Sequence, residues 1–461
     1  MTSPLFEPIR GQQVFGPDLP DYDALTDCIR CGRCLPACPT YQHTTLEGQS
    51  PRGRLNLLRA VEDGKLALEE PRLEEHLYHC LDCRACDTVC PAGISIGALI
   101  VRGRAAIAHV RPRSRLIRFG LTAILVSPRR AEFFAAPLRW MQRLRLDRLG
   151  LAIFGRLPKI GPIVRDLIEL APAMSKPLRG ELHEGQSSSQ ANTRRVGFFL
   201  GCVMNVAYAD ASRASVRLME RYGCEVVTPS NQLCCGAPHE DQGMKDTARS
   251  FARRNIAAFD ALGDLRAIVA DCAACSGFLK EYTHLLRVDP DWAERARRFS
   301  SKVRDITEWL DEIMPHVVLS REPPEMGRSA KNGLDQDTLR HARGDKLKVT
   351  YHEPCHLANV QGVRRPPRAL MARLRNVDVC ELPDAARCCG SAGIYNLTHP
   401  TMSRRLLERK MDDVASTHAD VVVSANPGCL LQLNWGNKRH SASIAVRHIT
   451  QLIEAELLDE T

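Results

Sequence analysis

Two copies of one cysteine pattern near the N-terminus constrain this chain more than any other feature. Each copy has three cysteines spaced by two residues, then a fourth cysteine after three residues, followed by a proline. In chains with two cubane clusters, such a triplet holds one [4Fe–4S] cluster and the fourth thiolate reaches the other. The pattern therefore predicts two clusters in crossed sets, one held by Cys28, Cys31, Cys34 and Cys90 and the other by Cys80, Cys83, Cys86 and Cys38.

Structural zinc is the alternative occupant of these cysteines. Zinc sites typically use pairs of cysteines two to four residues apart, joined by a longer spacer. A triplet followed by Cys-Pro, present twice, does not divide into such pairs, so iron–sulfur is the preferred interpretation. The intervening sequence contains helical patterns such as RGRLNLLRAVEDG at residues 52–64. We therefore expect a mainly helical ferredoxin-type domain over residues 1–110.

The number of cysteines and the pattern of the N-terminus indicate the cellular compartment in which the chain works. The chain has 19 cysteines, but its N-terminus lacks the apolar core of a secretory signal, and disulfide frameworks typify small secreted domains. The longest nearly uncharged apolar run, residues 119–127, is far shorter than the ~20 residues of a membrane-spanning helix. We expect thiols that bind metal in a reducing cytoplasm, with peripheral contact at the inner face of the cell membrane as an open alternative.

Positive charge is concentrated between residues 101 and 180, where 17 Lys and Arg face four Asp and Glu in a chain of net charge +9. Arginines alternate with apolar residues at helical spacing, and prolines cut the pattern at Pro112, Pro128, Pro137 and Pro158. Residues 111–193 thus predict short basic amphipathic helices and a polar linker. Such helices can lie on an anionic membrane or pack on the helical domain or an acidic partner. Nucleic-acid binding is disfavoured because no recognition motif is present.

The second half of the chain is an internal repeat. Residues 194–320 and 347–461 each alternate strands with helices, and residues 321–346 between them are typical of a flexible linker. This alternation predicts α/β domains with mostly parallel sheets and helices on both faces. Ligands in such sheets collect beyond the carboxyl ends of the strands. In both copies the first and last expected strands end on a cysteine, which predicts a metal site at that edge.

A Cys-Cys-Gly (CCG) motif stands at the centre of each copy. Neighbouring thiols diverge, so they suit a larger cluster better than one small ion, and Gly236 and Gly390 allow a positive φ. Redox-active dithiols, zinc sites and simply buried thiols remain alternatives. The cysteines of the first copy are Cys202, Cys234, Cys235, Cys272 and Cys275, and those of the second are Cys355, Cys388, Cys389 and Cys429.

The second copy lacks a fifth cysteine, because Gln432 stands where the first has Cys275. His352 or His356 can supplement the four thiols, although a structural role is the more common one for a single histidine. Two further cysteines lie within expected strands, and we expect them to be core residues: Cys224 and Cys380.

Taken together, these motifs resemble the iron–sulfur subunit of glycolate oxidase (glycolate dehydrogenase). The segments that carry the resemblance include CIRCGRCLPACPTY, HCLDCRACDTVCPAGI, YHEPCHLANVQGVRRPPRAL, CCGSAGIYNL and ANPGCLLQL. The CCG domains are similar to those of heterodisulfide reductase catalytic subunits, where five cysteines hold a non-cubane [4Fe–4S] cluster. The resemblance implies such a cluster at the five cysteines of the first copy.

The resemblance also implies a complex in which a flavoprotein (FAD) subunit oxidises glycolate to glyoxylate and this chain passes the electrons towards quinone. The sequence contains no G-x-G-x-x-G fingerprint after a strand, so hydride removal is expected on another chain. No residue of this chain is expected to act as a catalytic acid or base. The rival functions are disulfide reduction as in heterodisulfide reductase, an iron–sulfur subunit for lactate or glycerol 3-phosphate, and a zinc-binding nucleic-acid adaptor.

Overall fold

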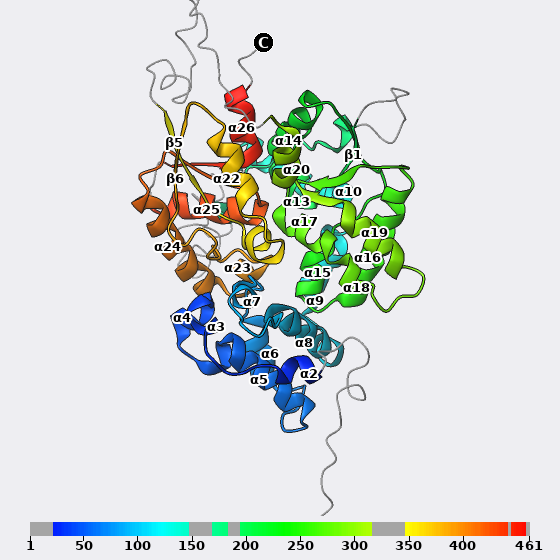
Figure 1. Cartoon of the computed structure of the whole chain (residues 1–461), viewed down its shortest axis with the longest axis vertical. Helices are drawn as coiled ribbons and strands as arrows, with labels where there is room; N and C mark the ends of the chain where they lie inside the picture. The colour runs from blue at the N-terminus through cyan, green and yellow to red at the C-terminus, as the bar shows by residue number, and fades with distance from the viewer. Residues whose placement is uncertain (1–21, 147–167, 183–193, 316–345, 441–443, 458–461) are drawn as a thin grey trace, which may run out of the picture.

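The computed structural model describes residues 22–146, 168–182, 194–315, 346–440 and 444–457. The expected linker at 321–346 lies almost wholly outside these residues, as does most of the polar stretch before residue 194. Three domains are visible: a ferredoxin domain (residues 22–110), a first CCG domain (194–315) and a second CCG domain (346–457). Figure 1 shows the ferredoxin domain, in blue, against the lower ends of both CCG domains.

The ferredoxin domain is helical, and its described residues contain no strand, which confirms the expected type. Its core is formed by side chains of several helices, including Leu55, Leu58, Leu77 and Ile107. The helix Pro51–Glu62 is capped by Ser50, whose hydroxyl accepts a hydrogen bond from the N–H of Gly53. The helices are α2 (Tyr22–Thr26), α3 (Cys34–Ala37), α4 (Pro39–Thr44), η1 (Glu47–Gln49), α5 (Pro51–Glu62), α6 (Pro71–Tyr78), α7 (Ala85–Thr88) and α8 (Ile96–Val110).

Each CCG domain contains a four-stranded parallel sheet, as the repeat predicted. The first sheet has the order β2-β1-β3-β4 and the second the matching order β6-β5-β7-β8. The strands are β1 (Arg194–Phe198), β2 (Cys224–Val227), β3 (Ala267–Ala270) and β4 (Val303–Asp305), then β5 (Leu347–Tyr351), β6 (Val377–Cys380), β7 (Val421–Ser424) and β8 (Ala445–His448).

Helices cover both faces of the two sheets. In the first domain they are α13 (Cys202–Ala207), α14 (Ala209–Arg221), α15 (Ala237–Asp241), α16 (Lys245–Asp260), α17 (Ala273–Lys280), α18 (Tyr282–Leu285), α19 (Ala293–Lys302) and α20 (Ile306–Ile313). In the second they are η4 (His356–Val360), α22 (Arg365–Ala372), α23 (Tyr395–Thr398), α24 (Pro400–Ser416), α25 (Pro427–His440) and α26 (Ile449–Leu457).

The strands differ from the expected ones in two respects. The fourth strand of each sheet was not predicted, because β4 and β8 are short and carry little apolar patterning. The expected strands also end earlier: β1 stops at Phe198 and β7 at Ser424, and the site cysteines stand in the turns and helix starts that follow. The thiols nevertheless lie beyond the carboxyl ends of the strands.

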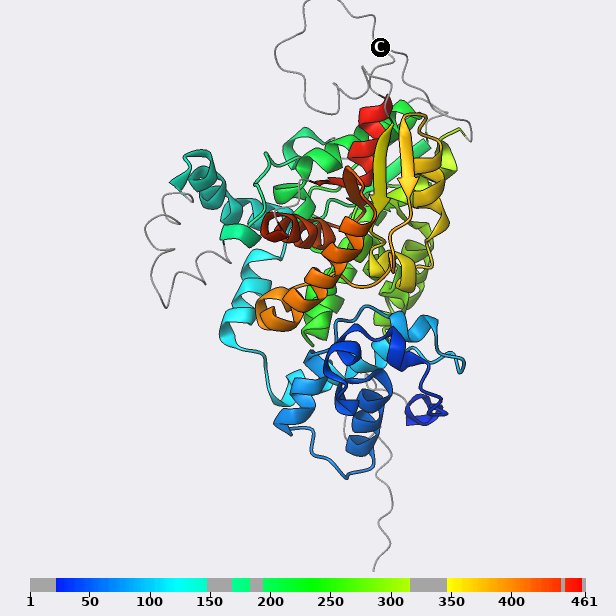
Figure 2. The ribbon, with the colours of Figure 1, turned by 90° about the vertical axis from the view of Figure 1, so that its left-hand side faces the viewer.

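The basic segment forms α9 (Arg115–Phe119), a π-helical turn η2 (Gly120–Ile124), α10 (Pro128–Arg143) and, after the undescribed residues 147–167, η3 (Arg179–Glu181). Pro137 was expected to cut this helix, but α10 continues through it. Proline removes the hydrogen bond to residue 133, and Phe133 lies on an exposed face where water can bind that carbonyl. Figure 2 shows the segment, in cyan, leaving the ferredoxin domain and running beside the CCG domains.

The two CCG domains share one core. Apolar residues of both sheets join through α14 and α26, which lie side by side in Figure 1. Ser215 bonds Thr450 at 3.2 Å, and the Arg217 guanidinium pairs with Glu454. The repeat therefore packs as a single body and fixes the distance between the two CCG sites.

Candidate metal centres and the cavity between them

The two ferredoxin loops have the same backbone conformation. Two alternate residues adopt positive φ in each loop, Arg30 and Gly32 in the first and Asp82 and Arg84 in the second. Only a tightly wound loop places non-glycine residues in this region. The winding directs successive N–H groups to one side, as in the backbone nests that bind anionic groups. Both loops are thus shaped to surround a negatively charged cluster.

The second triplet shares a cavity with the last cysteine of the first motif. Cys38, Cys80, Cys83 and Cys86 line this cavity together with Arg54. The Arg54 side chain is buried, donates to Thr40 at 3.1 Å and has a nitrogen 3.9 Å from the sulfur of Cys38. A buried guanidinium here offsets the negative charge of thiolates. The arrangement is the one that crossed ligand sets require.

The first triplet lies nearer the surface. Cys31 is exposed and Cys28 half-buried, while Cys34 is buried. Burial, as the largest cause, raises the pKa of Cys34, and the nearby Cys28 adds to this shift. Cys90 borders the same apolar core as Cys34. An electron carrier at this set would lie close to a docking partner.

In the first CCG domain, five buried cysteines converge from three turns. The sulfurs of Cys202 and Cys234 are 3.9 Å apart. Cys272 caps α17 and its sulfur accepts from the N–H of Cys275 at 3.4 Å. Hydrogen bonds from Cys234 and Cys275 lower the pKa of Cys235 to about 6, against the effect of burial. All five predicted residues are therefore brought together.

Buried polar side chains hold the first CCG turn in place. Asn255 donates to the carbonyl of Cys234 at 3.0 Å, and the hydroxyl of Tyr282 donates to that of Cys235 at 2.6 Å. Gly236 has a φ of 100°, a conformation that L side chains rarely adopt. These two hydrogen bonds and the glycine conformation hold the turn through groups other than the thiols.

The second CCG domain brings its four cysteines together in the same way. Side-chain interactions between the thiols join Cys355 to Cys388, Cys388 to Cys389, and Cys389 to Cys429, so the four sulfurs form a row. Of the two candidate histidines, His356 has its Nδ1 atom 3.6 Å from the sulfur of Cys355. His352 lies on the other side of the row, close to Cys389 and Cys429.

Three of the four thiol sets are neighbours: the second ferredoxin set and the two CCG sets. Cys83 of the ferredoxin domain shares a buried apolar cluster with Cys388 and Cys355 of the second CCG domain. Asn426 connects the two CCG sites: its side-chain oxygen is 3.6 Å from the sulfur of Cys272, and its nitrogen is 3.4 Å from the sulfur of Cys429. A line of sulfur atoms therefore extends through all three domains.

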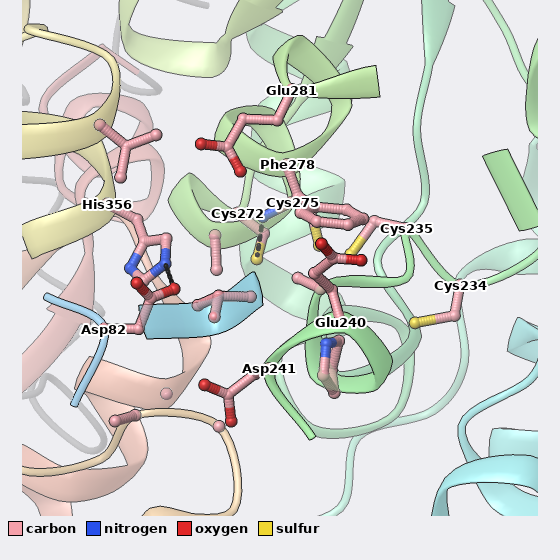
Figure 3. A pocket seen from close by; sticks show the side chains of 18 of the residues that line it. Asp82, Cys234, Cys235, Glu240, Asp241, Cys272, Cys275, Phe278, Glu281 and His356 are labelled. Atoms are coloured by element: carbon pink, nitrogen blue, oxygen red, sulfur yellow. Dashed lines mark hydrogen bonds and ion pairs between the residues drawn. The ribbon is translucent and has the colours of Figure 1, made fainter. Parts of the chain in front are cut away.

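A cavity of about 430 Å³ opens beside the first CCG site. Figure 3 shows Cys235, Cys272 and Cys275 on one wall, with His356 and Asp82 on the facing wall. Much of the lining is apolar, including Phe278. Three acidic side chains, Glu240, Asp241 and Glu281, also line it, and burial raises the pKa of Glu240 to about 7.

Comparison with known proteins identifies both kinds of domain. Residues 24–94 match the family model "4Fe-4S dicluster domain", and residues 196–280 and 349–434 each match "Cysteine-rich domain". The "Probable glycolate oxidase iron-sulfur subunit" of Bacillus subtilis is 35% identical over 94% of this chain and 94% of its own length. This chain belongs to the family of glycolate oxidase iron–sulfur subunits.

Two further relatives match this chain over different shares of its length. The "Glycolate oxidase iron-sulfur subunit" of Escherichia coli is 31% identical over 95% of each chain. The "Lactate utilization protein A" of Oceanobacillus iheyensis is 30% identical and covers 56% of this chain with 96% of its own length. Within the described residues of this chain, no helix is both long and apolar enough to cross a bilayer.

The donor sets of this iron–sulfur subunit fit their cofactors. Thiolate is the ligand of [4Fe–4S] clusters, and the loops above supply thiols in groups with buried positive charge and wound backbone. The chain therefore carries iron–sulfur clusters, whose chemistry is one-electron transfer. The division of the cysteines among clusters remains the prediction made from their spacing.

Sequence reasoning missed two functional candidates in this subunit. Arg54 lies within the helical segment between the cysteine motifs, where only burial distinguishes it from the exposed arginines. Asn426 lies three residues before Cys429, and its position between two sites depends on contacts between the domains. The two expected core cysteines differ: Cys224 is buried in the shared core, whereas Cys380 is half-buried.

Proposed function

We propose that this chain is the electron-transfer subunit of a flavin-dependent 2-hydroxy-acid dehydrogenase that oxidises glycolate to glyoxylate. A separate FAD-bearing chain removes the hydride, and this chain passes electrons towards quinone. The names of the two relatives that match along nearly the whole chain support the substrate. The observation that carries the proposal is the buried cluster that contains both Cys83 and Cys388, which brings the ferredoxin thiols next to the CCG thiols.

Electrons enter, on this proposal, at the first ferredoxin triplet. Cys31 is exposed, and the neighbouring Ile29 is 68% exposed. The exposure of Cys31 places this thiol set within reach of a partner at the surface. A flavoprotein bound there would lie close to the first cluster.

Electrons leave at the cavity beside the first CCG site. Quinone reduction takes up two electrons and two protons, and an apolar pocket next to a redox centre suits the quinone ring. Glu240 lines the cavity, and burial raises its pKa to about 7, so the carboxyl is partly protonated at neutral pH. The chain would thus offer an apolar binding surface and a proton donor in one place, a role for an acidic side chain that the sequence did not predict.

The basic segment would hold the chain at an anionic membrane. One face of α10 is fixed to the first CCG domain, where Asn205 of α13 donates to the Glu132 carboxylate at 2.8 Å. The other face exposes Phe133 by 75% and Trp140 by 58%, and Leu116 of α9 is 81% exposed. Exposed aromatic and aliphatic side chains among arginines characterise interfacial helices. This contact would bring the cavity within reach of membrane quinone.

The test uses the complex purified without oxygen together with its co-purifying subunits. Glycolate, lactate and glycerol 3-phosphate are supplied in turn, with a water-soluble quinone as acceptor. We expect glycolate to reduce the clusters and the quinone, and removal of the flavoprotein to abolish both. A preference for lactate or glycerol 3-phosphate would replace the substrate, and full activity without a flavoprotein would refute the division of labour.

Disulfide reduction is the second candidate, because the cavity gives small molecules access to the first CCG cysteines. A thiol assay with a disulfide substrate and reduced protein separates the two functions. Thiol release at a rate matching cluster oxidation would favour disulfide reduction over quinone reduction.

A further inference from the structure

The two CCG repeats differ at the residue three positions before their first cysteine. Phe199 precedes Cys202 in the first copy, and His352 precedes Cys355 in the second. The two residues are structurally equivalent: the N–H of Phe199 donates to Val269 at 2.8 Å and that of His352 to Val423 at 2.9 Å. The second copy therefore has an imidazole where the first has a phenyl ring.

The imidazole of His352 is buried without a well-formed hydrogen bond. The residue is 1% exposed, and within the described part of the chain its ring interacts with the backbone of Ala385, but without the geometry of a full hydrogen bond. Burying such a polar ring without a bond costs free energy, and buried polar groups that lack a partner are rare in folded proteins. Phe199 occupies the matching place as an ordinary core residue. The histidine thus has a ring nitrogen available to a ligand.

The ring is directed at the thiols. One ring nitrogen of His352 and the sulfurs of Cys389 and Cys429 all lie within 4.8 Å of one another, and all three residues are buried. Imidazole and thiolate are both ligands of iron and zinc. The other candidate, His356, contacts Cys355 instead and also faces Asp82 at 3.9 Å.

The residue at the position of the missing thiol does not replace it. Gln432 is buried and donates from its amide nitrogen to Ser403 at 2.9 Å. Its free amide oxygen is a hard ligand, which suits magnesium or calcium better than thiolate-bound iron. The second copy therefore has no thiol at the position that corresponds to Cys275, but it has an imidazole at the position that corresponds to Phe199.

We infer that His352 is the fifth ligand of an iron–sulfur centre at the second CCG site, with Cys355, Cys388, Cys389 and Cys429. The inference rests on the proposed iron–sulfur role of the CCG domains. Both CCG sites would then have five ligands, four thiolates and one imidazole in the second against five thiolates in the first.

The experiment labels histidine with ¹⁵N in the full-length protein, purified without oxygen, and records pulsed EPR spectra of its paramagnetic clusters. We expect a ¹⁵N hyperfine coupling in the wild type that disappears in His352→Phe, the residue found in the first copy. His352→Cys should keep the iron content of the wild type without the nitrogen coupling. His356→Phe is the matched control and should keep the coupling.

Four outcomes would overturn the inference. Two concern the variants: a ¹⁵N coupling that survives in His352→Phe, or one that disappears in His356→Phe. Two concern the wild type: no ¹⁵N coupling, or zinc at the site. The signals of the two ferredoxin clusters serve as internal reference: their presence without the coupling refutes the histidine ligand alone, whereas their absence refutes the proposed function.

Discussion

Cys83 of the ferredoxin domain and Cys388 of the second CCG domain lie in one buried apolar cluster. The contact is held by hydrogen bonds across the same interface, from Asn359 to the carbonyl of Cys83 at 2.9 Å and from Tyr395 to that of His79 at 3.2 Å. Electron transfer between domains requires a short, fixed separation of the redox centres. The interface supplies that separation through side chains of both domains.

The crossed ligand sets predict paired effects of serine substitutions. Cys38 lies in the cavity of the second triplet, so Cys38→Ser should change the same EPR signal as Cys80→Ser. Cys90→Ser should change the signal that Cys28→Ser changes. Potentiometric EPR of the four variants checks this. If Cys38→Ser and Cys28→Ser altered one common signal, the sets would be uncrossed.

Gly390 is predicted to be essential to the second CCG turn. Its φ is 87°, and an added Cβ would lie 2.7 Å from the backbone oxygen of Ser403. Gly390→Ala should therefore lower the free energy of unfolding by about 3 kcal/mol through strain and overpacking. Gly362 has a φ of 69° with open space around it, so Gly362→Ala should cost only about 1 kcal/mol. Equal losses in chemical denaturation would contradict the steric argument.

Arg104 of α8 is predicted to hold the ferredoxin domain to the first CCG domain. Its buried guanidinium pairs with Asp241 and donates to the carbonyl of Leu77 at 3.0 Å. Removing one partner of a buried ion pair typically costs 3–5 kcal/mol, so Arg104→Ala should destabilise the fold by about 3 kcal/mol. The exposed pair of Arg297 and Glu294 provides the control, and Arg297→Ala should cost less than about 0.5 kcal/mol. Limited proteolysis between the domains offers a second measurement.

Asp305 is predicted to make stability depend on pH. Burial raises its pKa to about 6, whereas an unfolded aspartate titrates near ~3.9. Between these values the folded state holds a proton that the unfolded state has lost, so this group lowers stability as pH rises from 4 to 6, and the loss persists above pH 6.

The variant Asp305→Asn removes the titration but keeps an N-cap acceptor for Thr307. Its stability relative to the wild type should therefore rise by about 2 kcal/mol between pH 4 and pH 7. Denaturation at several pH values measures this difference, with the exposed Asp264→Asn as control. A difference that is constant with pH would show that burial does not raise this pKa.

Much of the fold was predictable because its signals are local. The cysteine spacing, the strand–helix alternation and the repeat all follow from residues close in sequence, and α24 lies between β6 and β7 as this alternation predicts. The short strand β4 has three residues, too few for a pattern. The helix through Pro137 required knowing that Phe133 faces solvent.

The relations between sites were less predictable. Asn426 and Cys272 are separated by over a hundred residues, and their contact depends on how the two sheets share a core. The same is true of Cys83 and Cys388. The two candidate histidines show what the sequence leaves open. It offered His352 and His356 as equal candidates, and only the folded chain shows which thiols each of them faces.

Metal analysis combined with EPR of the chain purified without oxygen tests the central claim most directly. We predict iron and labile sulfide without stoichiometric zinc, and dithionite-reduced spectra with two interacting [4Fe–4S] signals from the ferredoxin domain. Zinc in place of iron and sulfide, or a reduced sample without paramagnetic centres, would contradict electron transfer by this chain.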